Sequence, residues 1–355
     1  MTSEIKQQLE GIFVKIPDTN KKKLLQNFFE TDVEEYLQKM FDLEKLIIDN
    51  KIPQDKAYTL YSSYSDYLIG KMADIEVAID KKEILKKIKQ VFRKQADNFI
   101  NKIFLLRWGY NKPSGHPGDY KLIEMLYNNE PLSKGLSFCG DKYLLKDSYV
   151  QAIRIRKDIM KDKLIYFIEN SKIEKMSIMN LGCGSCREIS EIFENKKMLL
   201  NKKLMFTLID WDKEALDFSK KVLDKYSSED IKFNFVQENI VNLHKTPEKY
   251  SKLFGKQDLI YSIGLVDYLP SLILGDVINF CFNLLNEKGI LTLAHKNVKV
   301  HKSIASDWFC DWLFFPRSKE DMMEIIEKSL ENRKYKIKIS EDKTKHIFFI
   351  DISNQ

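Results

Sequence analysis

The sequence predicts an α/β protein with a doubly wound, Rossmann-like sheet that follows an all-helical N-terminal region. Three observations lead to this prediction. A short apolar run, a glycine turn and a helix start follow one another within residues 176–188. Strand and helix patterns then alternate over residues 204–295, which is typical of parallel sheets covered by helices. The first hundred residues instead show helical periodicity, with Gly70 as the single glycine between residues 12 and 108.

Apolar residues in the N-terminal region recur mostly at spacings of three and four, as in amphipathic helices. They are Leu24, Phe28, Tyr36, Leu37, Met40, Leu43 and Ile47, and further along Ile84, Ile88, Val91, Phe92, Phe99 and Ile103. Pro17-Asp18 and Pro53 are expected to mark helix starts, which gives about four helices. For the chain of 355 residues we expect a helical domain at 1–110, a connecting loop region at 111–145 that contributes to the active site, and an α/β domain at 146–355.

The connecting region contains K-P-S-G-H-P-G-D-Y at residues 112–120, where two prolines and two glycines fix an irregular backbone. Such a loop either turns the chain between domains, with Asp119 capping a helix over 120–127, or presents side chains to a site. The second interpretation makes His116, Asp119 and Tyr120 candidate catalytic residues. The sequence leaves both interpretations open.

The α/β region begins with a helix pattern at 149–168, rich in Arg154, Arg156 and Lys157. These charges are expected either on a solvated face or on a lid over a ligand. The later elements are a helix at 213–225, strands at 231–236 and 258–262, a helix at 271–286 and a strand at 290–295. This alternation predicts the doubly wound sheet.

The turn N-L-G-C-G-S-C-R suits close contact with a ligand, because Gly182 and Gly184 have no Cβ and the following amides carry partial positive charge. The next strand, at 204–209, ends in Asp210, where a carboxylate would hold the two hydroxyls of a ribose. Arg187 stands in the place of the third glycine of G-x-G-x-x-G, which removes the close helix packing of a pyrophosphate site. The pattern therefore favours S-adenosylmethionine over NAD as the cofactor.

Four segments, N-L-G-C-G-S, L-I-D-W, Q-E-N-I and D-L-I-Y-S-I-G-L, resemble motifs I to IV of class I S-adenosylmethionine-dependent methyltransferases. The resemblance covers about residues 173–295. It implies a seven-stranded sheet, and patterns near 335–339 and 346–350 fit the antiparallel hairpin that closes such a sheet. The domain at 146–355 is then expected to be the methyltransferase domain.

The resemblance also implies roles for individual residues. Gly182 and Gly184 would lie beside the methionine part of the cofactor, Asp210 would hold the ribose hydroxyls and Trp211 would lie against the adenine. Asn239 would meet the adenine amino group, where many members of the family have Asp. The other residues expected around the cofactor are Asn180, Cys183, Ile240, Ser262 and Gly264.

Three further segments, G-x-P-G-D-Y, G-L-V-D-Y-L and D-W-x-x-x-P-R-S-x-E-D-M, resemble a subgroup usually described as making the methyl ester of 3-hydroxypalmitic acid, an extracellular signal. This likeness covers about residues 107–326. The chain departs from the subgroup at 294–297, which reads A-H-K-N where G-N-F is common, and at His116, where Tyr or Phe is frequent.

Which residues are candidates for catalysis depends on the chemistry of the methyl acceptor. A carboxylate is ionised at neutral pH and needs only cations and hydroxyls to orient it, for which the candidates are Tyr268, His295, Lys296 and Arg317. An alcohol or amine needs a base, for which they are His116, Asp119 and His295. We expect a small-molecule or fatty-acyl acceptor, with carboxylate methylation as one reaction. The alternatives are a cyclase or lyase that releases methylthioadenosine from the cofactor, and a regulatory module that only binds it.

Composition sets the remaining expectations. The 58 basic and 52 acidic residues give a net charge of +6 that is scattered along the chain, so we expect no nucleic-acid partner. Cys183 and Cys186 form a C-x-x-C without a second pair at metal spacing, so we expect no metal, reduced thiols and a cytoplasmic location. No apolar run of about 18 residues and no signal pattern is present, so we expect no integral membrane association. A homodimer through the helical domain is left open.

Overall fold

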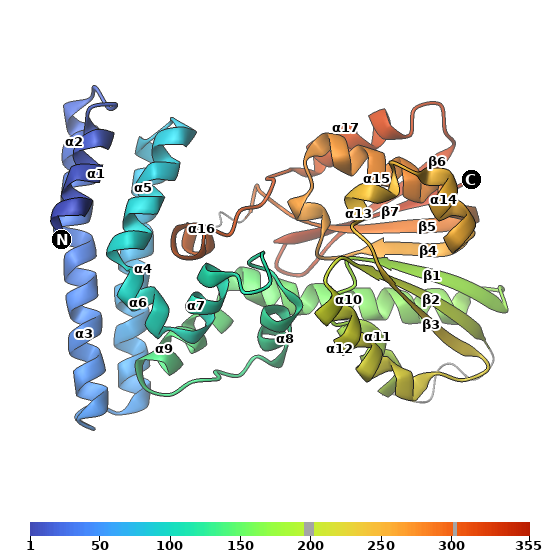
Figure 1. The fold of residues 1–355 in the computed structure, drawn as a ribbon, viewed down its shortest axis with the longest axis horizontal. Coiled ribbons are helices and arrows are strands. Elements are labelled where there is room, and N and C mark those ends of the chain that lie inside the picture. The colour runs from blue at the N-terminus through green and yellow to red at the C-terminus, as the bar shows by residue number, and fades with distance from the viewer. Residues whose placement is uncertain (195–201, 301–303) are drawn as a thin grey trace. The chain divides into compact units, whose positions relative to one another are not determined.

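A computed structural model describes residues 1–194, 202–300 and 304–355 (Figure 1). The chain divides into two compact units, each with its own hydrophobic core. The helical unit comprises residues 1–147 and 304–313, and the sheet unit comprises residues 148–300 and 314–355. A segment that follows the fifth strand in the sequence thus belongs to the helical unit, which the sequence did not indicate.

Helices make up the regular structure described in the first unit. Asp18 caps α2 by accepting the N–H groups of Asn20 and Lys21, and Pro53 precedes α4, as the sequence predicted. A π-helical turn joins α2 to α3 without a break. Before residue 112 the structure describes α1, the α2–α3 run, α4, α5, α6 and α7, which is more than the four helices expected. The elements are α1 Ser3–Phe13, α2 Thr19–Asn27, η1 Phe28–Val33, α3 Glu34–Ile48, α4 Gln54–Ala78, α5 Lys82–Gln95, α6 Asp97–Lys102, α7 Phe104–Asn111, α8 Tyr120–Asn128, α9 Gly135–Leu145 and α16 Ile304–Cys310.

Aromatic packing holds α16 in the helical unit. Trp308 is fully buried and makes edge contacts with Phe28 and Phe92, at centroid distances of 5.4 and 5.5 Å. Lys89 forms ion pairs with Glu76 and with Asp307 on α16, at 2.6 and 2.5 Å. The ammonium of Lys89 is buried, and the two carboxylates offset part of the cost of removing it from water. Its ion pair with Asp307 also holds α16 against α5.

The second unit is built on a seven-stranded sheet of order β3-β2-β1-β4-β5-β7-β6. β3, β2, β1, β4 and β5 are parallel, while β7 runs antiparallel to both β5 and β6. The predicted fold class is confirmed, including the final hairpin. The strands are β1 Lys175–Leu181, β2 Lys203–Asp210, β3 Ile231–Gln237, β4 Gln257–Ser262, β5 Leu285–Lys296, β6 Tyr335–Glu341 and β7 Ile347–Asn354.

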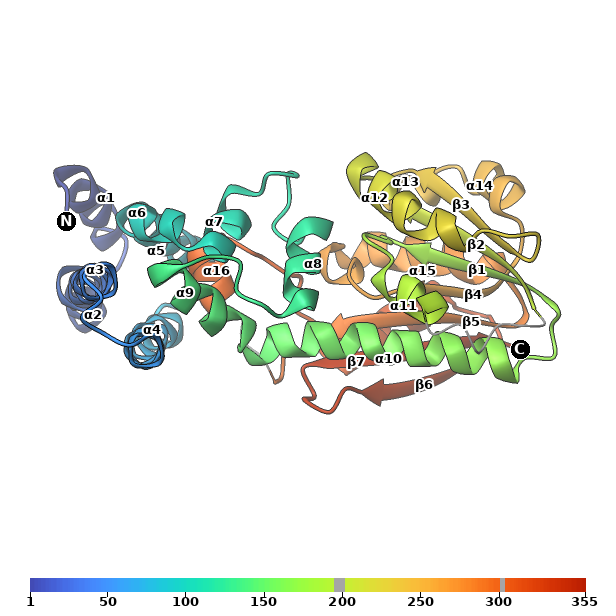
Figure 2. The same cartoon turned by 90° about the horizontal axis from the view of Figure 1, so that it is seen from below.

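Helices cover both faces of the sheet (Figure 2). One face packs against α13 Ile240–Leu243, α14 Pro247–Phe254, α15 Ser271–Leu284 and α17 Lys319–Ser329 in a single apolar core. The other face carries α10 Ser148–Asn170, α11 Arg187–Glu194 and α12 Lys213–Leu223. Lys163 of α10 pairs with Asp351 of β7 at 2.6 Å, and Phe193 of α11 packs edge-on against Phe206 of β2.

The strand order places a switch point between β1 and β4. The chain leaves β1 toward β2 on one side and leaves β4 toward β5 on the other. In open parallel sheets a ligand binds outside the carboxyl ends of the strands where the order reverses. The glycine turn after β1 and the loop after β4 meet at this point. Of the helices that the structure describes, none is both long and apolar enough to cross a membrane.

Two helical glycines test the packing of the helical unit. A Cβ on Gly140 in α9 would lie 2.5 Å from Ile103 Cγ2 and 2.9 Å from the hydroxyl of Tyr61, whereas a Cβ on Gly70 in α4 meets nothing within 4 Å. We expect Gly140→Ala to lower the free energy of unfolding by about 1 to 3 kcal/mol through overpacking. Gly70→Ala should raise it by about 0.5 to 1 kcal/mol. Urea unfolding measures both, and equal effects of the two substitutions would contradict the described packing.

Candidate active site

The glycine turn follows β1 at the switch point. Gly182 and Gly184 have φ angles of +67° and +53°, in the left-handed region that side chains rarely adopt. The N–H groups of Gly182 and Cys183 donate to the carbonyl of Ile209, at 2.9 and 3.0 Å, which fixes the turn against the end of β2. A Cβ on Gly182 would lie 3.1 Å from Cβ of Leu265, in the loop after β4. Both the backbone angle and this close approach therefore favour glycine at position 182.

Asp210 ends β2 beside the glycine turn. Its Oδ2 accepts the N–H of Gly184 at 2.9 Å, and its Oδ1 accepts the N–H of Asp212 at 3.0 Å. The side chain is buried, whereas the next residue, Trp211, is 50% exposed. A hydrogen-bonding carboxylate and an exposed aromatic ring thus stand together at the carboxyl edge of the sheet.

A buried polar cluster lies beneath the turn. The Asn180 amide donates to Glu188 Oε1 at 3.1 Å, and the Tyr261 hydroxyl donates to the same oxygen at 2.8 Å. Burial raises the pKa of Glu188, although the bond from Tyr261 opposes this. Cys183 and Cys186 are also buried, and burial raises the pKa of the Cys183 thiol well above its usual value. Glu188 is not among the residues predicted from the sequence, because an acidic residue in the first turn of a helix has no feature that marks it as buried.

The other predicted cofactor residues lie along the same edge. The Ser262 hydroxyl donates to the Leu181 carbonyl at 2.9 Å and so ties the end of β4 to the end of β1. Asn239 is exposed and caps α13, accepting the N–H of Val241 at 3.0 Å, and Ile240 is buried behind it. Asn239 thus has a local structural role, and its predicted contact with adenine stays a prediction.

A network of three buried side chains joins the ends of β4 and β5. His295 is 1% exposed, and its Nδ1 lies 2.7 Å from the Lys296 carbonyl and 3.3 Å from Asp267 Oδ1. Its Nε2 lies 3.3 Å from Nη1 of Arg317, which can only donate. These partners assign the proton to Nδ1 and make Nε2 an acceptor. Both ring nitrogens are therefore engaged within the protein.

Arg317 holds the loop after β4 in place. Its guanidinium donates to the carbonyls of Val266 and Leu269 and to the hydroxyl of Ser271. Burial lowers the pKa of Arg317, and the neighbouring Asp267 opposes this shift. The loop between these carbonyls carries Tyr268, so the guanidinium positions a predicted site residue.

Lys296 lies at the end of β5 among aromatic rings. Its ammonium is 4.5 Å from the ring centroid of Tyr149 and 4.4 Å from that of Phe314, although the residue is only 6% exposed. The ring of Phe314 also contacts that of Tyr268, at 5.4 Å. We call these four residues the aromatic lysine cluster. It combines a buried cation with apolar walls beside the loop after β4.

The predicted loop residues His116, Asp119 and Tyr120 belong to the helical unit. Asp119 is fully buried and caps α8 by accepting the N–H of Leu122 at 2.8 Å. Its other oxygen accepts the indole N–H of Trp108 at 2.9 Å. These are the hydrogen bonds expected if Asp119 caps a helix, which is the first of the two interpretations of this loop. The catalytic roles of His116, Asp119 and Tyr120 stay predictions.

Comparison with known families decides the class of the sheet unit. Residues 172–348 match the family model of a methyltransferase domain. The protein is a class I S-adenosylmethionine-dependent methyltransferase. S-adenosylmethionine is accordingly its methyl donor, as the sequence predicted. No curated protein matches the chain.

Solved structures resemble this methyltransferase at low identity. A possible exported protein from Bordetella parapertussis is 11% identical with a TM-score of 0.51, covering 92% of this chain and 96% of that chain, and shares the fold. Magnesium protoporphyrin IX methyltransferase from Synechocystis PCC 6803 with bound S-adenosylmethionine is 9% identical with a TM-score of 0.41. The match covers 59% of this chain and 85% of that chain. An N-methyltransferase from Bradyrhizobium japonicum WM9 in complex with S-adenosyl-L-homocysteine is 12% identical with a TM-score of 0.40. The match covers 66% of this chain and 97% of that chain.

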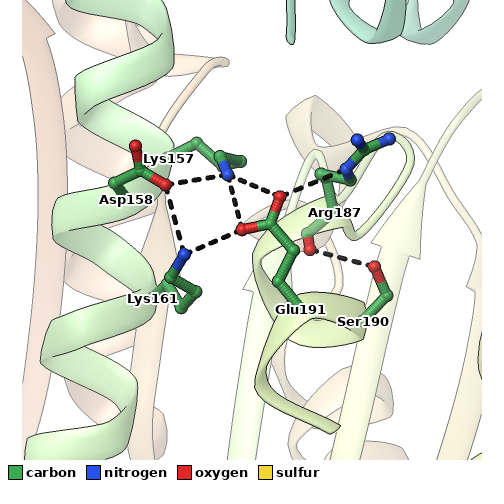
Figure 3. A network of polar contacts seen from close by, with 6 residues as sticks. All are labelled: Lys157, Asp158, Lys161, Arg187, Ser190 and Glu191. Carbon is green, nitrogen blue, oxygen red and sulfur yellow. Dashed lines mark hydrogen bonds and ion pairs between the residues drawn. The ribbon is translucent and has the colours of Figure 1, made fainter. Parts of the chain in front are cut away.

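An ionic network links α10 to α11 of the methyltransferase, just after the glycine turn (Figure 3). Lys157 and Lys161 of α10 both approach Glu191, at 2.5 and 2.8 Å, and Arg187 approaches it at 3.2 Å. Asp158 pairs with both lysines, at 2.8 and 3.2 Å. Burial alone would raise the pKa of Glu191, but the hydrogen bonds from Lys157 and Lys161 outweigh it, so this pKa is lowered.

The lowered pKa of Glu191 predicts a pH-dependent effect of Glu191→Gln. A carboxylate whose pKa is lower in the folded state stabilises the protein above its unfolded pKa of about 4.3, and this stabilisation is lost as the pH falls through the folded value. We expect the substitution to lower the free energy of unfolding at pH 7 by about 1.5 to 3 kcal/mol. The difference from the native protein should shrink below about pH 4.

Thermal unfolding between pH 3 and pH 7 measures this difference. Glu324→Gln is the matched control, because Glu324 pairs with Lys328 at 2.6 Å on the exposed side of α17 and such pairs contribute about 0 to 1 kcal/mol. A pH-independent effect of Glu191→Gln, or one no larger than that of the control, would refute the stabilising role of the network.

Proposed function

We propose that this methyltransferase esterifies the carboxylate of a small apolar acceptor, such as a fatty acid, at the carboxyl ends of β4 and β5. The observation that carries this proposal is the aromatic lysine cluster. A carboxylic acid with an apolar body needs a cation for its charged end and an apolar wall for the rest. Lys296 supplies the cation, and the rings of Tyr149, Phe314 and Tyr268 supply the wall.

The state of His295 also favours a carboxylate. An alcohol or amine must lose a proton during methyl transfer, so it requires a base within hydrogen-bonding reach. The ring nitrogens of His295 are occupied by the Lys296 carbonyl and by Arg317. A carboxylate is already ionised at neutral pH and requires no base. In this proposal His295 positions Lys296 and the loop of Tyr268, and it does not transfer a proton.

The residues at the switch point fit the cofactor. Each carboxylate oxygen of Asp210 has lone pairs for more than one donor, as the two hydroxyls of a ribose require. Trp211 offers an exposed flat face for adenine, and the glycine turn permits close approach of a ligand to the backbone. When bound, S-adenosylmethionine supplies a methyl group that is already electrophilic. The protein then has to orient the acceptor oxygen and exclude water, which the buried cluster supports.

The resemblance to the proteins of 3-hydroxypalmitic acid methyl ester synthesis is consistent with this acceptor class. We therefore include 3-hydroxypalmitic acid among the acceptors to be tested. The remaining predicted cofactor residues, Asn180, Cys183, Asn239, Ile240, Ser262 and Gly264, are proposed to surround the cofactor on the same edge.

Product analysis tests the reaction. The purified protein is incubated with S-adenosylmethionine and with matched acids, alcohols and amides of equal chain length, and products are followed by mass spectrometry. We expect S-adenosylhomocysteine and a methyl ester with the acids alone. Methylthioadenosine without any acceptor would instead indicate a cyclase or lyase, and methylation of the alcohol or amide alone would refute the carboxylate.

Asp210→Ala tests the cofactor site. Loss of the ribose contacts should weaken binding of S-adenosylmethionine by about 10- to 100-fold, since a hydrogen bond to a charged group contributes about 1.5 to 3 kcal/mol. Titration calorimetry measures the affinity directly. Asp217→Ala, an exposed substitution on α12, is the control that should leave it unchanged. Equal affinity of the native and Asp210→Ala proteins would contradict the proposed placement.

Lys296→Met tests the acceptor site. The substitution removes the ammonium and keeps an unbranched apolar side chain of similar length. We expect KM for the acid to rise about 10- to 100-fold, because a charge-assisted bond of about 1.5 to 3 kcal/mol is lost. Affinity for S-adenosylmethionine should not change, and Lys296→Arg should retain part of the activity. Unchanged KM for the acid in Lys296→Met would exclude this lysine from acceptor binding.

A further inference from the structure

A buried carboxylate that takes no part in the proposed reaction lies beside the aromatic lysine cluster. Asp267 is the middle residue of the short 3₁₀ helix η3 Val266–Tyr268, in the loop after β4. It is 1% exposed, and the next residue, Tyr268, belongs to the cluster. Burial of a carboxylate is costly unless hydrogen bonds and opposite charges offset it, so the partners of Asp267 indicate what it holds in place.

The side chain of Asp267 holds the end of β5. Its Oδ1 accepts the backbone N–H of Lys296 at 2.9 Å and lies 3.3 Å from Nδ1 of His295. The pairing of β5 with β4 ends at Leu293, so Lys296 lies beyond the last paired residue and Asp267 supplies the acceptor for its N–H. A charged acceptor makes this hydrogen bond stronger than one between neutral groups.

The backbone of Asp267 holds a second segment. Its carbonyl accepts the N–H of Phe315 at 2.8 Å. Phe314, the preceding residue, supplies one of the rings that contact the ammonium of Lys296, at 4.4 Å. Asp267 therefore joins three parts of the sheet unit, which are the loop after β4, the end of β5 and the segment that begins at residue 314.

We propose that Asp267 is a positioning residue for the acceptor, because its hydrogen bond to the Lys296 N–H fixes where the Lys296 ammonium lies against its aromatic neighbours. The ammonium stands on a flexible four-carbon stem, so the position of its backbone limits where the charge can be presented. A misplacement of about 1 Å in a site can lower a rate by about 100-fold. The proposal rests on the acceptor site of the proposed function, and it does not depend on the placement of the cofactor.

Steady-state kinetics of the full chain with the acid that yields a methyl ester test this role. The variant is Asp267→Ala. Partial unfolding lowers the amount of active enzyme and so the apparent kcat, whereas a displaced lysine raises KM. We expect KM for the acid to rise about tenfold or more, while the affinity for S-adenosylmethionine stays within about twofold. Asp267→Asn should keep KM within about threefold of the native value, because its amide oxygen can accept the same N–H.

Asp258→Ala is the matched control. Asp258 is 5% exposed and likewise accepts a backbone N–H, that of Ser177, at 2.8 Å. It lies near the amino end of β4, at the opposite edge of the sheet from the acceptor site. We expect this variant to lower stability as Asp267→Ala does and to leave KM unchanged. Amide hydrogen exchange at the end of β5 should become faster in Asp267→Ala and should keep its native rate in Asp258→Ala.

An unchanged KM in Asp267→Ala, or an equal rise in Asp258→Ala, would overturn the positioning role. A KM in Asp267→Asn as high as in Asp267→Ala, or unchanged exchange at the end of β5, would also overturn it. Asp267→Leu keeps the side-chain volume but cannot accept a hydrogen bond. It replaces Asp267→Ala if the latter fails to fold, as judged by its thermal unfolding.

Lys296→Met distinguishes these results from failure of the proposed function. If Lys296→Met raises KM and Asp267→Ala does not, only the role of Asp267 fails. If Lys296→Met leaves KM unchanged, the acceptor site itself is misplaced, and the role of Asp267 fails with it.

Discussion

The site depends on the close approach of two loops at the point where the strand order of the sheet reverses. β1 and β4 are neighbours, but the chain leaves them in opposite directions, and in sheets of this kind a ligand binds outside the carboxyl ends of the strands at that point. The packing of Gly182 against Leu265 fixes how near these loops come. Asp210 is held in the same arrangement through the N–H of Gly184.

Buried charge is divided between structural and chemical roles at this edge. Arg317 gives its donors to the carbonyls of the loop after β4 and to His295, so its charge stabilises the fold. The cations around Glu191 likewise join α10 to α11. Lys296 differs from them in its aromatic surroundings, which give an ammonium a favourable but weakly polar environment.

The sequence was sufficient to predict the sheet and the position of the glycine turn, because both follow from local rules. Apolar runs that alternate with helical patterns require a covered parallel sheet, and a glycine turn after a strand requires left-handed backbone. The roles of His295, Lys296 and Arg317 could not be separated from the sequence. Their partners, such as Tyr149 for Lys296 and Val266 for Arg317, are distant in the chain. The membership of α16 in the helical unit depends on the burial of Trp308, which periodicity does not reveal.

We propose that the cofactor binds at the switch point between β1 and β4. A crystal structure of the protein with S-adenosylhomocysteine would show this binding site. We expect the ribose hydroxyls within hydrogen-bonding distance of the Asp210 carboxylate and the adenine against Trp211. A ligand bound away from the glycine turn, or one whose ribose contacts other residues, would contradict it.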